Sequence, residues 1–331
     1  MKRIFLFALL LCAMASNAFA QTEIKFASLA PDGSTWMKTM RALGKEVSEK
    51  TGGKVTFKFY PGGVQGDEVD ILRKIRIGQL HAGGFTGNGI GEILPAARVL
   101  EVPFLFHTEE ELDAAVAAVQ ADLERGFEEK GFVLLGWSDV GFVHFFSKDR
   151  IQTSKDLMGK KVWMWQGDPL ARSLFQSFGI TPIPLSVQDV MTSLQTGMVD
   201  VVYASPLAAI ALQWQTRTKY VTEQPVTYAS GAVLLSKTAY NKLTADQQRI
   251  LKSVAAKQLR DLTVQTRKDN DAAFATLKAS GLTVTPFPSD AELGKMEAIG
   301  MKTRTQLTGT LYSKDLINRV ETAVSKYRES E

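Results

Sequence analysis

Hydrophobic and polar positions along the chain follow two periods in turn, the two-residue period of strands and the helical period. Residues 54–60 alternate polar and apolar side chains, which is the two-residue period of a half-buried strand. A helix is indicated before this strand by apolar residues with helical spacing at Trp36, Met40, Leu43 and Val47. A further strand is predicted at 23–29. Because strand, helix and strand follow in this order, the opening of the chain predicts a parallel sheet.

The same alternation continues through both halves of the chain. Further strands are predicted at 79–85, 160–165, 180–185 and 198–203, and helices at 67–77, 108–130, 168–178 and 186–196. The pairs Val64-Gln65 and Val187-Gln188 each precede a helix, a glycine and a strand. They indicate one comparable unit in each half, either related by descent or merely two βαβ units that look alike.

A long helical tract is predicted late in the chain. Thr244 and Gln247 form a capping box, and no Gly or Pro interrupts the sequence from there to about Ala279. At about 1.5 Å per residue this helix exceeds roughly 50 Å, which is longer than one lobe is wide. We therefore expect it to span two lobes. A second helical tract is predicted from Ser289 to near Arg328.

The first residues have the order of a secretory signal peptide. Lys2 and Arg3 precede an apolar run from Ile4 to Met14, and Ala18 and Ala20 supply small residues at a cleavage site. Cleavage after Ala20 and export to the periplasm are therefore predicted. An uncleaved anchor or a buried first helix is the alternative interpretation.

Composition disfavours several kinds of site and several classes of protein. The chain has one cysteine, Cys12, inside the predicted signal peptide, so we expect no disulfide and no Cys-ligated metal after cleavage. Lys plus Arg number 39 against 35 acidic residues, a formal charge of +4 that is too small for a nucleic-acid footprint. No stretch beyond the first residues is long and apolar enough to be embedded in a membrane. The roughly 310 residues after Ala20 favour two lobes.

Four segments together resemble one known family. They are residues 61–68 (PGGVQGDE), 75–80, 102–106 (VPFLF) and 193–200 (SLQTGMVD). The chain resembles the solute-binding proteins of TRAP transporters, the DctP-like receptors. The resemblance implies an α/β, type II-like periplasmic binding fold of two lobes, each a mixed, mainly parallel sheet flanked by helices.

The resemblance also implies domain limits and partners. Strands near 141–147 and 228–235 would cross between the lobes. Lobe I would comprise 21–141 and 236–265, and lobe II 142–235 and 266–331. The partners would be a small-molecule ligand and the small and large membrane subunits of a TRAP transporter. No cofactor, no metal and no catalytic residue is expected.

The chain departs from the family at the position that anchors the ligand. Family members usually hold a carboxylate with an arginine, whose planar guanidinium grips both oxygens. In the stretch that matches this arginine, residues 159–165, Trp163 stands at the arginine position. Elsewhere in the chain, Val143 replaces a second arginine found in many members, and Ser205 replaces the usual asparagine before Pro206. An indole cannot neutralise a carboxylate. A hydrophobic or aromatic solute is therefore predicted, with a carboxylate held by a non-standard anchor as the alternative.

The predicted site combines an aromatic wall with a few polar contacts. Trp163 and Trp165 lie on one face of their strand, so both line the pocket or both belong to the core. Thr86 and Asn88 follow a strand at its carboxyl end, where α/β sheets bind ligands. Glu68 either receives a polar group or caps a helix, and Trp36 and Phe142 are either pocket or core. The predicted ligand-binding residues are Trp163, Trp165, Tyr203, Phe85, Thr86, Asn88, Glu68, Val143, Ser205 and Trp36.

An exported enzyme and a ligand sensor are the two rival functions. An exported enzyme is disfavoured because the chain has no Gly-x-Ser-x-Gly, His-Glu-x-x-His or phosphate-loop motif, and His81, His107 and His144 are isolated in the sequence. A ligand sensor or scaffold that takes no part in uptake remains open. Binding by hinge closure and delivery to a membrane permease is the prediction.

Overall fold

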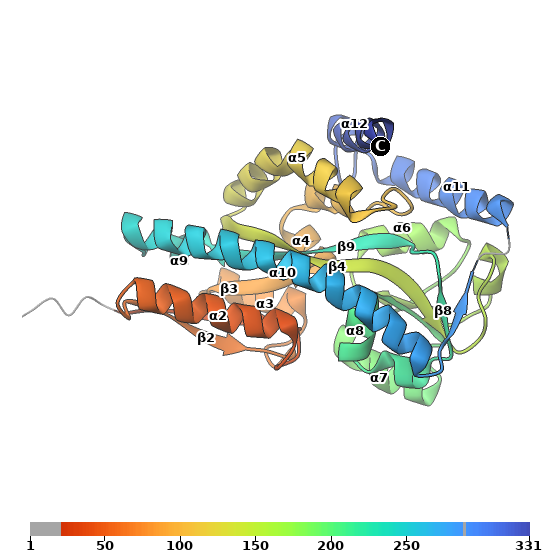
Figure 1. Ribbon diagram of the computed structural model, residues 1–331, viewed down its shortest axis with the longest axis horizontal. Coiled ribbons are helices and arrows are strands. Elements are labelled where there is room, and N and C mark those ends of the chain that lie inside the picture. The colour runs from red at the N-terminus through yellow and green to blue at the C-terminus, as the bar shows by residue number, and fades with distance from the viewer. Residues whose placement is uncertain (1–20, 287–288) are drawn as a thin grey trace, which may run out of the picture.

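The computed structural model describes residues 21–286 and 289–331, so the predicted signal peptide and its cleavage site lie outside the described residues. Two α/β lobes lie side by side, and one long helix runs across both (Figure 1). Searched over the described part of the chain, no helix has the length and apolar character needed to cross a bilayer.

An 8-stranded mixed sheet, in the order β10-β8-β4-β9-β3-β1-β2 with β7 paired to β4, connects the lobes, and β5 and β6 form a 2-stranded sheet. The strands are β1 (Thr22–Ser28), β2 (Val55–Tyr60), β3 (Ala82–Thr86), β4 (Phe132–Ser147), β5 (Trp163–Trp165), β6 (Ile183–Leu185), β7 (Val201–Ala204), β8 (Tyr220–Thr222), β9 (Thr227–Ser236) and β10 (Thr283–Thr285).

Helices flank these sheets on both sides. The α-helices are α2 (Thr35–Lys50), α3 (Glu68–Arg76), α4 (Gly87–Ile93), α5 (Glu109–Glu129), α6 (Pro169–Ser177), α7 (Val187–Thr196), α8 (Pro206–Ala211), α9 (Lys237–Tyr240), α10 (Ala245–Ala279), α11 (Asp290–Leu307) and α12 (Lys314–Ser330). The 3₁₀ helices are η1 (Pro95–Glu101), η2 (Ser154–Leu157) and η3 (Trp214–Arg217).

Parallel strand pairs lie within each lobe, and every antiparallel pair includes one of the crossing strands β4 and β9. In lobe I, β1 pairs in parallel with β2 and with β3. In lobe II, β10 pairs in parallel with β8, and β5 with β6. The antiparallel pair β4 and β9 passes between the lobes, with β3 beside β9 at one end and β7 and β8 beside β4 at the other. The predicted two-lobe α/β fold is confirmed.

The late helix is continuous over 35 residues from Ala245 to Ala279. Its start is fixed by the predicted capping box, in which the backbone amides of Thr244 and Gln247 each bond the other residue's side chain, at 2.9 and 3.3 Å. The helix packs against α2 in lobe I, against the crossing strand β4, and against α8 in lobe II. It therefore spans both lobes, as its length predicted.

The C-terminal helix α12 lies in a different lobe from the one predicted. Residues 266–331 were assigned to lobe II, but α12 packs against α5, and its apolar residues join the lobe I core. The buried residues of α12 in that core are Leu316, Ile317, Val320 and Val324. Burial of this apolar face, rather than sequence proximity to α11, decides where α12 lies.

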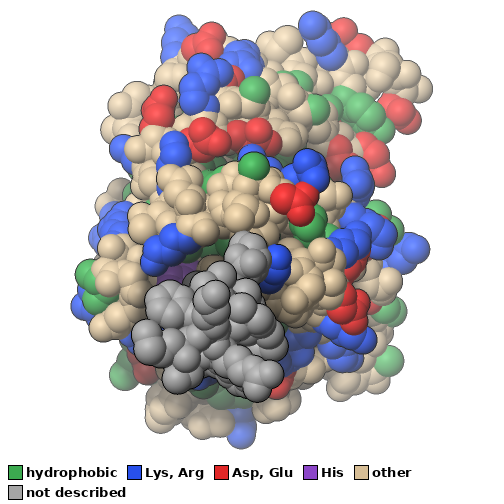
Figure 2. All heavy atoms as spheres, turned by 90° about the vertical axis from the view of Figure 1, so that its left-hand side faces the viewer, with side chains coloured by type: hydrophobic (Ala, Val, Ile, Leu, Met, Phe, Trp, Pro, Cys, Tyr) green, Lys and Arg blue, Asp and Glu red, His purple; other side chains and the backbone are tan. Residues whose placement is uncertain are grey.

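Charges are mixed on the surface. On the face shown in Figure 2, Lys and Arg side chains are interspersed with Asp and Glu, and no large cluster of one sign is visible outside the area that grey atoms cover. Interspersed charge matches the small formal charge of +4.

Candidate ligand-binding site

A cavity of about 450 Å³ lies between the lobes. Its wall takes residues from β1, β3 and η1 in lobe I, from β5, α6 and β7 in lobe II, and from the crossing strands β4 and β9. Every predicted site residue lies on this wall. They are Trp36, Glu68, Phe85, Thr86, Asn88, Val143, Trp163, Trp165, Tyr203 and Ser205.

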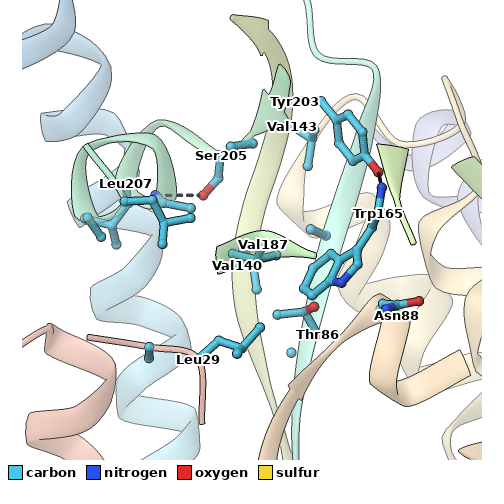
Figure 3. Close-up of a pocket in the computed structure, with 18 of the residues that line it drawn as sticks. Leu29, Thr86, Asn88, Val140, Val143, Trp165, Val187, Tyr203, Ser205 and Leu207 are labelled. Atoms are coloured by element: carbon cyan, nitrogen blue, oxygen red, sulfur yellow. Dashed lines mark hydrogen bonds between the residues drawn. The ribbon is translucent and has the colours of Figure 1, made fainter. Parts of the chain in front are cut away.

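Much of the remaining wall is aliphatic. Figure 3 shows Leu29, Val140, Val187 and Leu207 around the same space as Val143 and Trp165. Sequence reasoning missed these residues because an aliphatic residue next to a strand or at a helix start carries no signal that separates pocket from core. Phe142, which the sequence left open as pocket or core, is not among the residues that line the cavity. It packs edge-on against Tyr228, with ring centroids 4.9 Å apart.

The close approach of Trp36 to the sheet depends on a glycine. A side-chain Cβ at Gly84 would lie 2.2 Å from the indole of Trp36, so only glycine leaves room for this ring against β3. Trp36 also lies beside Phe26, with ring centroids 6.4 Å apart. The indole therefore belongs to the wall and to the lobe I core at once.

Trp163 is built into an aromatic stack. Its ring lies parallel to Tyr203 at 4.7 Å and edge-on to Trp214 at 5.2 Å, and only 2% of the residue is exposed. Its indole Nε1 donates to the backbone oxygen of Leu185 at 3.1 Å. The one polar atom of this side chain is thus used by the protein, and Trp163 offers a ligand only an apolar surface.

Trp165 connects the lobes. Its Nε1 donates to the carboxylate of Asp67, with distances of 3.2 and 3.1 Å to the two oxygens. Asp67 caps α3 of lobe I through the amide of Glu68 at 2.6 Å, and accepts from the amide of Val187 in lobe II at 3.2 Å. Burial raises the pKa of Asp67, although these bonds act in the opposite direction. Asp67 was absent from the predicted site. It does not line the cavity itself, but it joins lobe I to Trp165 and Val187, which do.

Glu68 acts as a cap for a short helix. Its carboxylate accepts from the amides of Thr86 at 2.7 Å and Gly89 at 2.6 Å, at the start of α4. The residue is fully buried, and this burial raises its pKa to about 8. Both oxygens are engaged by backbone amides of α4 and its N-cap, whereas the capping alternative considered from the sequence concerned α3, the helix that Glu68 begins and that Asp67 caps.

Thr86 and Asn88 carry unpaired polar atoms at one end of the cavity. Among the described residues, neither Thr86 Oγ1 nor Asn88 Nδ2 has a hydrogen-bond partner, although both atoms are buried. In Figure 3 both side chains lie beside the indole of Trp165, away from Leu207. A buried polar atom without a partner costs about 1–3 kcal/mol, so a ligand gains from a hydrogen bond to either of these two atoms, as it would at the hydroxyl of Tyr228, another unpaired atom of the wall.

Charge on the wall is dominated by carboxylates. Among the wall residues the structure describes, Arg98 is the only Arg or Lys, and Glu68, Glu101, Asp139 and Asp168 are the acidic ones. The guanidinium of Arg98 bonds both oxygens of Asp168 at 3.0 Å and lies 2.8 Å from Glu101. The one cation is thus engaged by two carboxylates.

Matches to known sequences point to a single family. The family model described as "Bacterial extracellular solute-binding protein, family 7" (DctP) matches residues 26–302. A solute-binding protein of Verminephrobacter eiseniae is 27% identical over 273 residues, covering 81% of each chain. The 2,3-diketo-L-gulonate-binding periplasmic protein YiaO of Escherichia coli is 24% identical over 258 residues, covering 74% of this chain and 75% of its own.

Solved structures share the fold. The sugar acid binding protein DctPAm of Advenella mimigardefordensis, in complex with galactonate, superimposes with a TM-score of 0.86 at 22% identity, covering 92% of this chain and 98% of its own. A TRAP periplasmic solute-binding protein of Pseudomonas putida F1, with bound D-glucuronate, gives 0.81 at 24% identity, covering 90% and 96%. The ligands named for these proteins are acids, so they give no support to an apolar ligand, which rests on the cavity of this chain.

Proposed function

This chain belongs to family 7 of the bacterial extracellular solute-binding proteins, the DctP-like receptors of TRAP transporters, and from that premise we propose that it captures a small solute in the interlobe cavity and delivers it to the membrane permease. The partners would be the small and large membrane subunits of the transporter. Rotation of the lobes about the crossing segments 141–147 and 228–235 would close the cavity over the solute.

The proposed ligand is uncharged and largely apolar or aromatic. The observation that carries this proposal is the state of Arg98, which is already held by Asp168 and Glu101. An anion entering the cavity would lose its water and meet these carboxylates without a free cation to pair with. An apolar solute meets no such cost, and it would bury its surface against Leu29, Val140 and the aromatic wall.

One polar group on this solute is expected. Asn88 Nδ2 is an unpaired donor, and the Thr86 hydroxyl can donate or accept. A hydroxyl or carbonyl oxygen on the ligand would satisfy both and orient the molecule, with its apolar body toward Leu207. The proposed class is therefore a neutral alcohol or ketone with a cyclic or aromatic body.

An acid receptor with a non-standard anchor is the competing function. It is favoured by the galactonate and D-glucuronate bound to structural relatives. Acid binding here would require Arg98 to release Asp168, because Arg98 is the only described cation on the wall.

Matched probes separate the two functions. Isothermal titration calorimetry would compare 2-phenylethanol with phenylacetate, which share a body and differ in charge, and with D-glucuronate. We expect 2-phenylethanol to bind at least about tenfold more tightly than phenylacetate, a difference of about 1.4 kcal/mol, and D-glucuronate not to bind. Tighter binding of either acid than of 2-phenylethanol would refute the neutral-ligand proposal.

Two tryptophan substitutions locate the binding. Leu207→Trp fills the cavity and should abolish binding of 2-phenylethanol. Val264→Trp adds the same ring at a position that is 50% exposed on α10, and should leave binding unchanged. Equal effects of the two substitutions would show that the probe binds elsewhere.

A further inference from the structure

The pair Arg98 and Asp168 joins the two lobes across the cavity. Arg98 lies in η1 of lobe I, and Asp168 precedes α6 of lobe II, 70 positions along the chain. Two parallel bonds of 3.0 Å join Nη1 and Nη2 to the two carboxylate oxygens. Both side chains are nearly inaccessible, at 5% and 7%. This fork geometry is the one by which an arginine recognises the carboxylate of a ligand.

Neighbouring bonds keep both carboxylates in place. Asp168 Oδ1 also accepts from the amides of Leu170 at 2.8 Å and Ala171 at 3.2 Å, which caps α6. Glu101 accepts from the amide of Ser230 at 2.7 Å while its other oxygen faces Arg98. The guanidinium is therefore surrounded by fixed acceptors of the protein.

We propose that Asp168 determines the charge of the solute this receptor accepts, because its carboxylate occupies the guanidinium of Arg98 in the way a ligand carboxylate would. The proposal rests on the proposed function, since it concerns the specificity of the same cavity. Arg98 and Glu101 alone form a neutral pair, and Asp168 brings the group to one net negative charge. A ligand carboxylate therefore competes with a tethered carboxylate that is already in place.

The substitution Asp168→Asn should release this block while preserving the local fold. Asn is as good a helix cap as Asp, so α6 keeps its start. The fork of Arg98 loses its charged partner, and a ligand carboxylate restores the charge. We expect phenylacetate to bind Asp168→Asn at least about tenfold more tightly than it binds the wild type.

Two further variants test whether the gain in phenylacetate affinity depends on the guanidinium of Arg98 or only on the total charge of the cavity wall. Asp139→Asn also removes one carboxylate from the wall, but Asp139 pairs with Arg267, which does not line the cavity. It should not improve phenylacetate binding by more than about threefold. Adding Arg98→Leu to Asp168→Asn should abolish the gained affinity. Asp168→Ser, which keeps a capping oxygen without charge, repeats the test if Asp168→Asn does not fold.

The outcomes are distinguishable by calorimetry on the full protein. Unchanged phenylacetate affinity in Asp168→Asn, with 2-phenylethanol still bound, overturns the role of Asp168 and leaves the proposed function intact. Equal gains in Asp139→Asn and Asp168→Asn overturn it as well, because they indicate a general charge effect. If 2-phenylethanol fails to bind the wild type, the proposed function and this inference fail together.

Discussion

Replacing Asp67 by alanine should favour separation of the two lobes. The carboxylate makes two bonds between the lobes, to the indole of Trp165 and the amide of Val187, and one bond within lobe I, to the amide of Glu68. The substitution removes all three at once. We therefore expect both a less stable protein and a larger population of open molecules without ligand.

The magnitude follows from opposing contributions. Loss of the α3 cap costs about 1 kcal/mol of unfolding free energy. Two hydrogen bonds to a charged acceptor contribute about 3 kcal/mol at the lower end. Burial raises the pKa of Asp67, so desolvation of its charge offsets part of this gain. About half of the interlobe contribution is thus expected to remain, or about 1.5 kcal/mol, which changes the ratio of open to closed molecules roughly tenfold.

Small-angle X-ray scattering of the ligand-free protein measures this change directly. The radius of gyration of Asp67→Ala should exceed that of the wild type. Ser313→Ala is the matched control, because it removes the cap of α12, a bond of 3.1 Å to the amide of Leu316, without touching an interlobe contact. Equal radii for the wild type, Asp67→Ala and Ser313→Ala would refute the reasoning.

Three further substitutions test the site and its surroundings. Trp163→Arg, at 2% exposure in an aromatic stack, should lower the unfolding free energy by at least about 3 kcal/mol in urea denaturation, and a stable variant that binds D-glucuronate would contradict this. Burial lowers the pKa of His144 to about 4, so its stabilising contribution is present above pH 6.5 and lost as the pH falls through 4. Between pH 7 and pH 4 the wild type should lose roughly 3 kcal/mol more unfolding free energy than His144→Asn. Equal losses for the two proteins would contradict this. Gly84→Ala should displace Trp36 and cost about 1–3 kcal/mol, whereas Gly294→Ala, in open space on α11, should stabilise by up to about 1 kcal/mol, and similar melting temperatures for the two would show that Gly84 does not require glycine.

Much of the fold was predictable because its signals are local. The capping box at Thr244 and the absence of breakers up to Ala279 predicted α10. By contrast, α4 begins at Gly87-Asn88-Gly89, which has the composition of a loop. The amides of its N-cap Thr86 and of Gly89 are satisfied by Glu68, a residue of another helix. Such a helix is fixed by a tertiary contact, and no local pattern indicates it.

The site was predictable where it depends on position along strands. Thr86 and Trp165 end their strands at the cavity, and Tyr203 lies at the end of another. Asp168 was predicted at the start of a helix, but its bond to Arg98 joins residues 70 positions apart. Pairing of that kind depends on how the lobes meet, so sequence reasoning gave the apolar wall and missed the charge that accompanies it.

The ligand that the protein carries in the bacterium that produces it tests the central claim most directly. Protein purified from the bacterium that produces it would be denatured, and the released small molecule identified by mass spectrometry. We predict an uncharged, largely apolar or aromatic molecule with one hydroxyl or carbonyl oxygen. A sugar acid or another carboxylate released in equal amount to the protein would contradict the account.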